Sequence, residues 1–353
     1  MSNPIVSVII CTRNRSDNVL PAAQSVLRGD YTDLELLIMD QSDDNSTADA
    51  VMSLCEEDSR VRYFHLAPSG KPGALNAALQ EARGRYLALT DDDCESATQW
   101  IRALIAPFEK DAKVGAVFGD VRAAPHDQTQ GYIPDNPVEY DRSIASLRDY
   151  LRMPNMVNFG IGANMAVRAD VLHEVNGWDP CIGPGSRFRN GDDHDITVRI
   201  LLAGYTVAFT RAARIVHFGY RLWSESAKDV ANAGYGFGTS FAKFLRCGTL
   251  YYGSLRILFH FLGQIVWRSL RFQRPLGIAF PRGWLRGAME AANYPMDRTT
   301  RCFLKTDATA YGEDGHRYSQ VVLRTNQAEQ VEMPASASSL PPNAKQGEGP
   351  PSR

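Results

Sequence analysis

A chain of 353 residues is long enough for one large α/β domain with an appendage, and ordinary domain sizes make two the upper bound. Hydrophobic residues make up 44% of the sequence and charged residues 22%, which is typical of a globular protein. The formal net charge of −2 argues against a nucleic-acid-binding protein, and six cysteines without short Cys/His spacing argue against the common zinc sites.

Short apolar runs alternate with segments of helical spacing over the first part of the chain. The runs predict strands at 5–11, 34–39, 61–66 and 86–89, and the segments between them predict helices at 19–27, 47–55 and 74–82. This alternation predicts a doubly wound α/β sheet. Ligands of such sheets bind beyond the carboxyl ends of the strands, where this sequence has its polar clusters.

The pattern continues with a helix at 97–108 and a strand at 114–119, and an irregular stretch at 123–154 predicts a long connection or an acceptor-side subregion. Strand character returns at 158–168. A short helix at 169–175, a loop from Gly183 and a helix at 196–203 are expected next. Segments 205–209 and 213–217 are predicted to be a closing strand and a final edge.

The last third of the chain has a different character. Residues 227–245 have helical spacing, and 250–269 form a strongly apolar segment. We therefore expect an α/β domain over 1–222, a helical region over 223–300 and a tail over 301–353 that is disordered from about residue 326.

The apolar segment 250–269 has the length of a membrane span, and polar residues recur along it at every fourth position from Arg256. Inside hydrocarbon, Arg256 would cost about 2.5–3.5 kcal/mol even on the lenient insertion scale. Arginines without any acidic residue from Arg246 to Arg286 suit a helix that lies in the headgroup plane of an anionic membrane. A helix packed on the α/β domain is the alternative. Without an apolar leader, we expect a cytoplasmic protein, peripheral on the inner face of the cell membrane.

Asp91, Asp92 and Asp93 follow the fourth predicted strand directly. Three adjacent carboxylates repel one another, and a divalent cation removes that cost, with Mg²⁺ or Mn²⁺ preferred by oxygen ligands. Such a metal would bridge the phosphates of a nucleotide donor. An acidic turn that caps the next helix is the alternative. The position of the cluster among several acidic strand ends favours the metal.

Other polar residues lie where the same site would be built. Asp40 ends the second strand, where a carboxylate can bind a base or ribose, and Lys71 precedes a helix whose start suits an anion. Asp192 and Asp193 precede a helix and can provide a base that deprotonates an acceptor hydroxyl. Alternatively, Asp192 or Asp195 caps that helix.

Seven segments, in this order, resemble the family 2 inverting glycosyltransferases of the GT-A fold: VSVIICTRNR, DQSDDNST, GKPGALNAAL, ALTDDDC, GANMAVRADVL, GDDHDITVRILLAGY and IVHFGY. The resemblance covers about residues 5–220. It implies a Rossmann-like mixed sheet flanked by helices and a Mn²⁺ or Mg²⁺ cofactor. It also implies transfer of a sugar from a nucleotide-diphosphate donor to a glycan or lipid-linked acceptor, in the assembly of cell-surface polysaccharide or glycolipid.

The resemblance also implies roles for single residues. Thr12, Arg13 and Asp40 match positions that hold the base and ribose of the nucleotide. Asp91 and Asp93 match the outer carboxylates of the DxD element. Asp93 is then the direct metal ligand, and Asp91 binds the donor or supports the metal.

The remaining chemistry is expected further along the chain. Asp192-Asp193 matches a Glu-Asp pair in which the second residue is the usual base, so Asp193 is the predicted base. Because Asp192 stands where Glu is more usual, it stays open which of the two reaches the acceptor. The residues alone favour a structural histidine at His217, but the resemblance matches it to a histidine that completes the metal shell.

Two other functions are compatible with parts of the sequence. A nucleotidyltransferase would need a Gly-rich basic loop after the first strand, and CTRNRSDN is not one. A non-catalytic, membrane-associated subunit that binds a nucleotide-sugar would have no reason to retain carboxylates at 91, 93 and 193 together.

Overall fold

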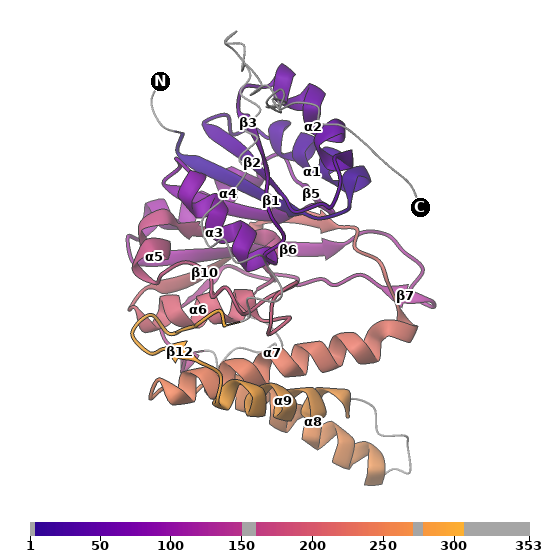
Figure 1. Cartoon of the computed structure of the whole chain (residues 1–353), viewed down its shortest axis with the longest axis vertical. Helices are drawn as coiled ribbons and strands as arrows, with labels where there is room; N and C mark the ends of the chain where they lie inside the picture. The colour runs from indigo at the N-terminus through magenta and orange to yellow at the C-terminus, as the bar shows by residue number, and fades with distance from the viewer. Residues whose placement is uncertain (1–3, 150–159, 271–277, 307–353) are drawn as a thin grey trace, which may run out of the picture.

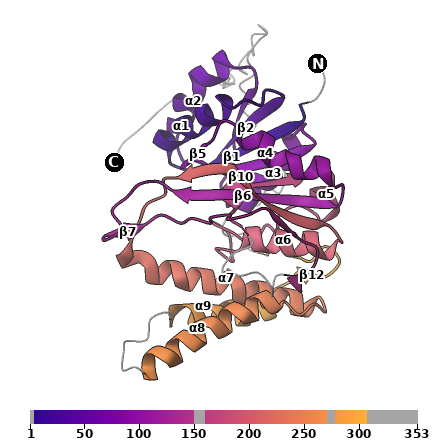
Figure 2. The ribbon, with the colours of Figure 1, turned by 180° about the vertical axis from the view of Figure 1, so that it is seen from behind.

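The computed structural model describes residues 4–149, 160–270 and 278–306. Within them, a nine-stranded mixed sheet runs in the order β3-β2-β1-β4-β9-β6-β10-β5, and β8 pairs with β10. Helices cover both faces of this sheet, and the C-terminal helices α7, α8 and α9 stack beyond one end of it (Figures 1 and 2).

The first half of the sheet has the predicted alternation of strands and helices. Its elements are β1 (Val6–Thr12), α1 (Ser16–Leu27), β2 (Leu34–Asp40), α2 (Ser46–Glu57), β3 (Val61–His65), α3 (Lys71–Glu81) and β4 (Tyr86–Asp91). The four strands pair in parallel, so their carboxyl ends lie at one edge. Val8 and Ile10 pack on one face of the sheet and Ile9 on the other, as expected for a strand covered by helices on both sides.

The second half makes the sheet mixed. Its elements are β5 (Cys94–Ser96), α4 (Trp100–Lys110), β6 (Val114–Ala123), β7 (Gly131–Tyr132), β8 (Arg142–Ile144), β9 (Met165–Arg168), α5 (Ala169–Glu174), α6 (Asp192–Leu202), β10 (Thr206–His217) and β11 (Arg221–Leu222). Strand β9 is antiparallel to both β4 and β6, which it joins. The ends of the irregular stretch 123–154 and of the predicted strand 158–168 include residues outside the described ones.

Two expectations for this half were wrong. Segments 205–209 and 213–217 form one strand, β10, which lies inside the sheet between β6 and β5 instead of at an edge. Its pairing with β6 shifts register between Thr210 and Arg214, and this irregularity explains why the sequence reads as two strands.

The start of α6 also differs from the expectation. The helix begins at Asp192, so Asp192 and Asp193 lie in its first turn rather than in a preceding loop. Its N-cap residue is Gly191, whose φ of 99° lies in the left-handed region that favours glycine, and no side chain caps the helix. The alternative in which Asp192 or Asp195 is the N-cap is therefore wrong.

Three helices follow the sheet: α7 (Ser226–Arg246), α8 (Tyr252–Leu270) and α9 (Ala279–Ala292), then the short strands β12 (Met296–Asp297) and β13 (Cys302–Phe303). Helices α7 and α8 confirm the predictions for 227–245 and 250–269, and α9 lies in the helical region expected over 223–300, although its own bounds were not predicted. A Cβ atom added at Gly234 or Gly238 of α7 would clash with backbone carbonyl oxygens of α9. The two helices therefore approach each other more closely than larger residues allow.

Helix α8 is packed on one side only. Ile257 is buried against α7 and α9, and Ser254 donates a hydrogen bond to the carbonyl oxygen of Phe237 at 2.7 Å. On the other side, Phe259 is 64% exposed and Val266 58% exposed. In the described part of the chain, no helix combines the length and the apolar character that crossing a bilayer requires. The tail predicted to be disordered lies outside the described residues.

Candidate active site

The register of the parallel strands brings the predicted nucleotide-site residues together. Thr12 at the end of β1 pairs with Asp40 at the end of β2, and Cys11 pairs with Asp91 at the end of β4. The acidic residues that follow β4 therefore lie beside the loop that follows β1. This is the carboxyl edge at which doubly wound sheets bind ligands.

Asp92 anchors this edge. It is 4% exposed, and its carboxylate accepts hydrogen bonds from Thr12 Oγ1 at 2.7 Å and from Arg15 Nη1 at 2.8 Å. Arg15 also donates to Asp93 Oδ2 at 3.0 Å. Sequence reasoning missed Arg15, whose only signal is its place two residues beyond Arg13. Thr12 and Arg15 thus fix the position of the acidic turn.

Asp40 is fully buried, and both of its oxygens are used within the chain. Oδ1 accepts hydrogen bonds from the backbone and hydroxyl of Ser42, and Oδ2 accepts one from Tyr63 Oη at 2.7 Å. Arg13 reaches Asp43 at 3.1 Å on the exposed surface. Asp40 therefore shapes the loop after β2, and the predicted contacts of Asp40 and Arg13 with a nucleotide stay predictions.

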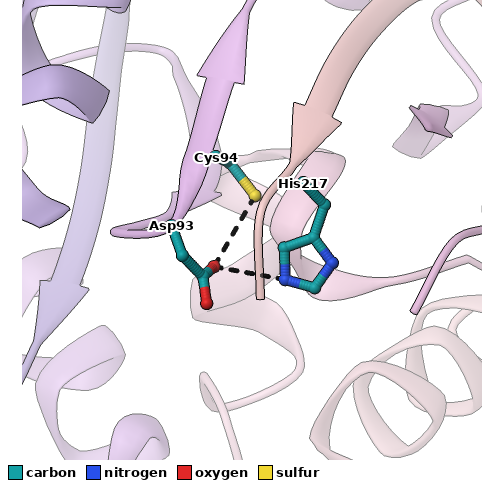
Figure 3. A group of neighbouring side chains, drawn as sticks. All are labelled: Asp93, Cys94 and His217. Carbon is teal, nitrogen blue, oxygen red and sulfur yellow. Dashed lines mark hydrogen bonds and ion pairs between the residues drawn. The ribbon is translucent and has the colours of Figure 1, made fainter. Parts of the chain in front are cut away.

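Asp93, Cys94 and His217 form a group whose potential ligand atoms all lie within 4.8 Å of one another (Figure 3). Antiparallel pairing of β5 with the end of β10 places His217 beside Cys94. His217 Nδ1 contacts the carbonyl oxygen of Pro134 at 2.7 Å, and that oxygen can only accept, so Nδ1 carries a proton. Nε2 then faces Asp93 Oδ1 at 3.2 Å. This orientation of the ring suits metal binding.

The donor set fits a divalent metal through Asp93 and His217. Burial opposes ionisation of Asp93, but His217, Arg15 and Lys71 outweigh it and lower the pKa of Asp93 to about 2. Burial strongly raises the pKa of the Cys94 thiol, which therefore keeps its proton and is a poor ligand. One carboxylate and one imidazole leave coordination positions for water and phosphate oxygens, as Mn²⁺ and Mg²⁺ sites require.

Lys71 lies among the carboxylates. It forms an ion pair with Asp91, and although burial opposes its charge, Asp91 and Asp192 together raise the pKa of Lys71. The preceding Gly70 has a φ of 78° and packs against Gly185, so the loop before α6 touches the start of α3. The structure thus brings Lys71 and Asp91 close to Asp192, a hundred residues away in the sequence.

The first turn of α6 contributes two partly buried carboxylates. Asp193 accepts hydrogen bonds from the backbone N–H of Gly162 at 3.3 Å and of His194 at 2.8 Å. Burial and the neighbouring Asp193 raise the pKa of Asp192 to about 7, with Lys71 opposing the shift. Burial also raises the pKa of Asp193. A carboxylate that titrates near neutral pH is suited to accept a proton.

Side chains that fit a divalent metal, a mostly buried lysine and two carboxylates of α6 thus meet at the carboxyl edge of a mixed α/β sheet, the arrangement that the resemblance to GT-A sugar transferases implies. Residues 7–175 match the model of the family described as "Glycosyl transferase family 2". This match covers just under half of the chain and confirms the family resemblance seen in the sequence.

The curated relatives match parts of the chain. An uncharacterised glycosyltransferase of Rickettsia felis is 40% identical over 90 residues, 25% of this chain and 14% of that protein. The GalNAc(5)-diNAcBac-PP-undecaprenol beta-1,3-glucosyltransferase of Campylobacter jejuni is 33% identical over 94 residues, 26% of this chain and 30% of that protein. The chain therefore spans less than a third of the length of these two relatives.

Similarity to a solved structure extends over more of the chain. A mannosyltransferase from Pyrobaculum calidifontis, solved with GDP-Man and Mn²⁺, superposes with a TM-score of 0.55 at 16% identity. The match covers 83% of this chain and 88% of that one. At this identity the likeness establishes the fold, which confirms the GT-A prediction.

Proposed function

We propose that this protein transfers a sugar from a nucleotide-diphosphate donor to an acceptor hydroxyl, with inversion at the anomeric carbon and with Mn²⁺ or Mg²⁺ as cofactor. One observation carries the proposal. The pair Asp93–His217 and the pair Asp192–Asp193 come from distant parts of the chain and meet at one sheet edge around Lys71. Inverting transfer needs both a site for the diphosphate and a separate base.

Each group has a distinct role in this reaction. Asp193 takes the proton of the acceptor hydroxyl as its oxygen attacks the anomeric carbon, and its hydrogen bonds to Gly162 and His194 fix the carboxylate. Asp192 is the alternative base. A metal held by Asp93 and His217, with Asp91 nearby, supplies positive charge to the leaving diphosphate. The ammonium of Lys71 stabilises the same developing charge.

The nucleotide lies over the ends of β1 and β2 in this proposal. Thr12, Arg13 and Asp40 border that surface, and Arg13 is half exposed, so its guanidinium is accessible to a ligand. Asp91 contacts Lys71 and lies, in this proposal, where the sugar of the donor binds. We assign these roles to residues 1–222 and a membrane-side role to 223–300.

We infer that the acceptor belongs to cell-surface polysaccharide or glycolipid assembly and is a glycan or a lipid-linked sugar. The Campylobacter relative, by its name, acts on an undecaprenol-linked glycan. An acceptor of that kind lies at a membrane surface, which agrees with a peripheral protein on the inner face of the cell membrane.

Helix α8 is the proposed membrane contact. Its exposed apolar residues recur on one face, at Phe259, Leu262, Val266 and Leu270. The neighbouring helix α9 exposes Leu285 and Met289 together with the side chain of Arg286, which is 66% exposed. An apolar face edged by arginines binds the interface of anionic lipid.

Flotation of the full chain with anionic phosphatidylglycerol liposomes tests this contact. The double variant Phe259→Ser, Val266→Ser should lose most of its binding, because it removes two exposed apolar anchors from α8. Ile5→Ser is the control, since Ile5 is 41% exposed and directly precedes β1, a strand that lies away from α8 in both views (Figures 1 and 2). Equal flotation of wild type and double variant would rule out docking through α8.

Transfer itself is tested by nucleoside diphosphate release. A panel of UDP-glucose, UDP-N-acetylglucosamine and GDP-mannose is first screened by thermal shift with Mn²⁺, since a ligand of the folded state raises its stability. The stabilising donor should then be hydrolysed slowly, and faster once an acceptor is present. Binding of a donor without any turnover would contradict the proposal and favour a non-catalytic nucleotide-sugar-binding subunit.

A further inference from the structure

Helix α7 touches the chain on both sides of the Asp192–Asp193 pair. Before the pair, a Cβ atom added at Gly236 would lie only 2.6 Å from the carbonyl oxygen of Asn190. After the pair, the ring of His194 packs on Phe237, with centroids 4.4 Å apart. Figure 1 shows α7 running alongside α6. The first turn of α6 is therefore seated on one helix of the C-terminal region.

A buried charge network fixes this contact. Lys243 of α7 is fully buried and donates to Asp195 Oδ1 and to Asp179 Oδ2, both at 2.6 Å. Asp195 Oδ2 accepts from Arg199 Nε at 2.9 Å. Asp179 Oδ2 also accepts the backbone N–H of Phe303 at 2.8 Å. The network ties α6 to α7 and β13 at a point two residues after Asp193.

The loop before α6 is held by the same helices. Its residues Cys181, Ile182 and Phe188 form one apolar cluster with Tyr235, Ala242, Ala291 and Phe303. Gly185, within this loop, contacts Gly70, the residue before Lys71. The C-terminal helices therefore determine the position of the segment that lies between Lys71 and the two carboxylates.

We propose that α7 positions the carboxylates of α6 for proton transfer, with Gly236 and Lys243 as positioning residues. The catalytic unit then extends beyond residue 222 and includes α7. This inference rests on the proposed function. Displacing a reacting group by about 1 Å can cost roughly a hundredfold in rate, so a small shift of α7 should lower kcat without weakening donor binding.

Two glycines of α7 provide a matched test. Gly236→Ala pushes on Asn190, the second residue before Asp192, whereas Gly238→Ala pushes on Trp284 of α9 and leaves α6 untouched. Mn²⁺-dependent hydrolysis of the best donor of the panel is measured below the melting temperatures of both variants. Gly236→Ala should lower kcat about 10- to 100-fold with the donor KM changed less than about twofold. Gly238→Ala should keep kcat within about threefold, even where it melts lower.

Lys243 is tested by substitution and rescue. Lys243→Met should lower kcat at unchanged donor KM, and Lys243→Arg, which restores the charge, should recover part of that loss. The control is Arg62→Met, which breaks a mostly buried pair with Glu35 at the far edge of the sheet and should leave kcat unchanged. If Lys243→Met does not fold, the comparison of kcat between Gly236→Ala and Gly238→Ala still tests the positioning role of α7.

The outcomes separate the inference from the proposed function. If the wild-type protein turned over none of the donors, both the positioning role of α7 and the proposed sugar transfer would be contradicted. A wild-type protein that turns over, with equal kcat losses in Gly236→Ala and Gly238→Ala, would overturn the positioning role of α7 alone. A fall in kcat confined to Gly236→Ala and Lys243→Met supports it.

Discussion

Two groups of charged side chains meet α6 within its first two turns, and they differ in the balance of positive and negative charges. Around Lys71, the carboxylates of Asp91, Asp192 and Asp193 share one ammonium group. In the second group, Asp179 and Asp195 are matched by two cations, Lys243 and Arg199, at hydrogen-bond distance. The first group is partly exposed, with Lys71 21% and Asp91 27% exposed, whereas Lys243, Asp179 and Asp195 are at most 1% exposed. The two groups therefore differ both in burial and in charge count.

The difference indicates what each group does. A balanced buried network can keep all its members ionised and hold elements together. Where carboxylates are in excess, not all of them can stay ionised. Burial, and then the neighbouring carboxylate of Asp193, raise the pKa of Asp192 to about 7. Groups whose pKa is displaced toward neutrality in this way are concentrated at functional sites. We therefore expect the group around Lys71 to serve the reaction and the group around Lys243 to hold α6 in position.

The largest expected effect follows loss of the base. Asp193→Asn keeps the shape of the side chain but cannot accept a proton, so kcat should fall by about 10²–10⁴-fold. Nucleoside diphosphate release with acceptor present measures it, and circular dichroism checks the fold. Asp192→Asn is the matched variant and should lose less. Near-normal turnover of Asp193→Asn, with a large loss in Asp192→Asn, would transfer the base role to Asp192.

The second-largest loss of turnover is expected when Asp93, the proposed metal ligand, is replaced. Asp93→Ala leaves His217 without its carboxylate partner, and the lost stabilisation of the leaving diphosphate should lower turnover by about 10³-fold. Stimulation by added Mn²⁺ should disappear as well. Cys94→Ser is the comparison, since its protonated thiol should contribute little as a ligand. Retained Mn²⁺ stimulation in Asp93→Ala would place the metal elsewhere.

Changes in the group of Lys243, Asp179 and Asp195 should lower the free energy of unfolding. Lys243→Met leaves Asp179 and Asp195 buried with one cation fewer, and removing one partner of a buried ion pair costs about 3–5 kcal/mol. Urea denaturation measures the free energy of unfolding. Arg286→Met, which removes an exposed pair with Glu290, should cost less than about 1 kcal/mol. Similar losses for the two variants would mean that Lys243 is not in a charge-balanced buried network.

The smallest effect is a pH dependence of stability. The pKa of Asp192 in the folded protein is raised to about 7, above the value of about 3.9 in an unfolded chain. The folded state therefore binds the proton more tightly, and this group makes the free energy of unfolding fall as pH rises from about 4 to 7.

Asp192→Asn removes that contribution. Its melting temperature should decline less between pH 5 and pH 8 than that of the wild type, as measured by differential scanning fluorimetry. Asp170→Asn, in which an exposed carboxylate is replaced, should retain the wild-type trend. Identical trends in wild type and Asp192→Asn would mean that Asp192 is ionised throughout this range.

Much of the sheet could be predicted from the sequence because β1 to β4 are short, mostly apolar runs that end in polar residues. The antiparallel direction of β9 could not, since it depends on the path of the long connection before it. The start of α6 was misplaced because its acidic first turn resembles a loop, and only the left-handed Gly191 marks the true boundary.

The site was predictable where strand register alone decides proximity. Thr12, Asp40 and Asp91 lie at the ends of neighbouring parallel strands and meet for that reason. Arg15 and Lys243 act through contacts across 77 and 48 residues, and no local pattern marks such contacts. The balance of charge in each group could not be predicted from the sequence either, because it depends on which cations lie beside which carboxylates in the folded chain.

The central claim is metal-dependent sugar transfer at the acidic edge of the sheet. Its most direct test is nucleoside diphosphate release from the stabilising donor by the wild-type protein, after EDTA treatment and then across a Mn²⁺ titration. We predict loss of release with EDTA and saturable recovery with Mn²⁺ in the wild type, and no recovery in Asp93→Ala. Release that is unaffected by EDTA would contradict the claim.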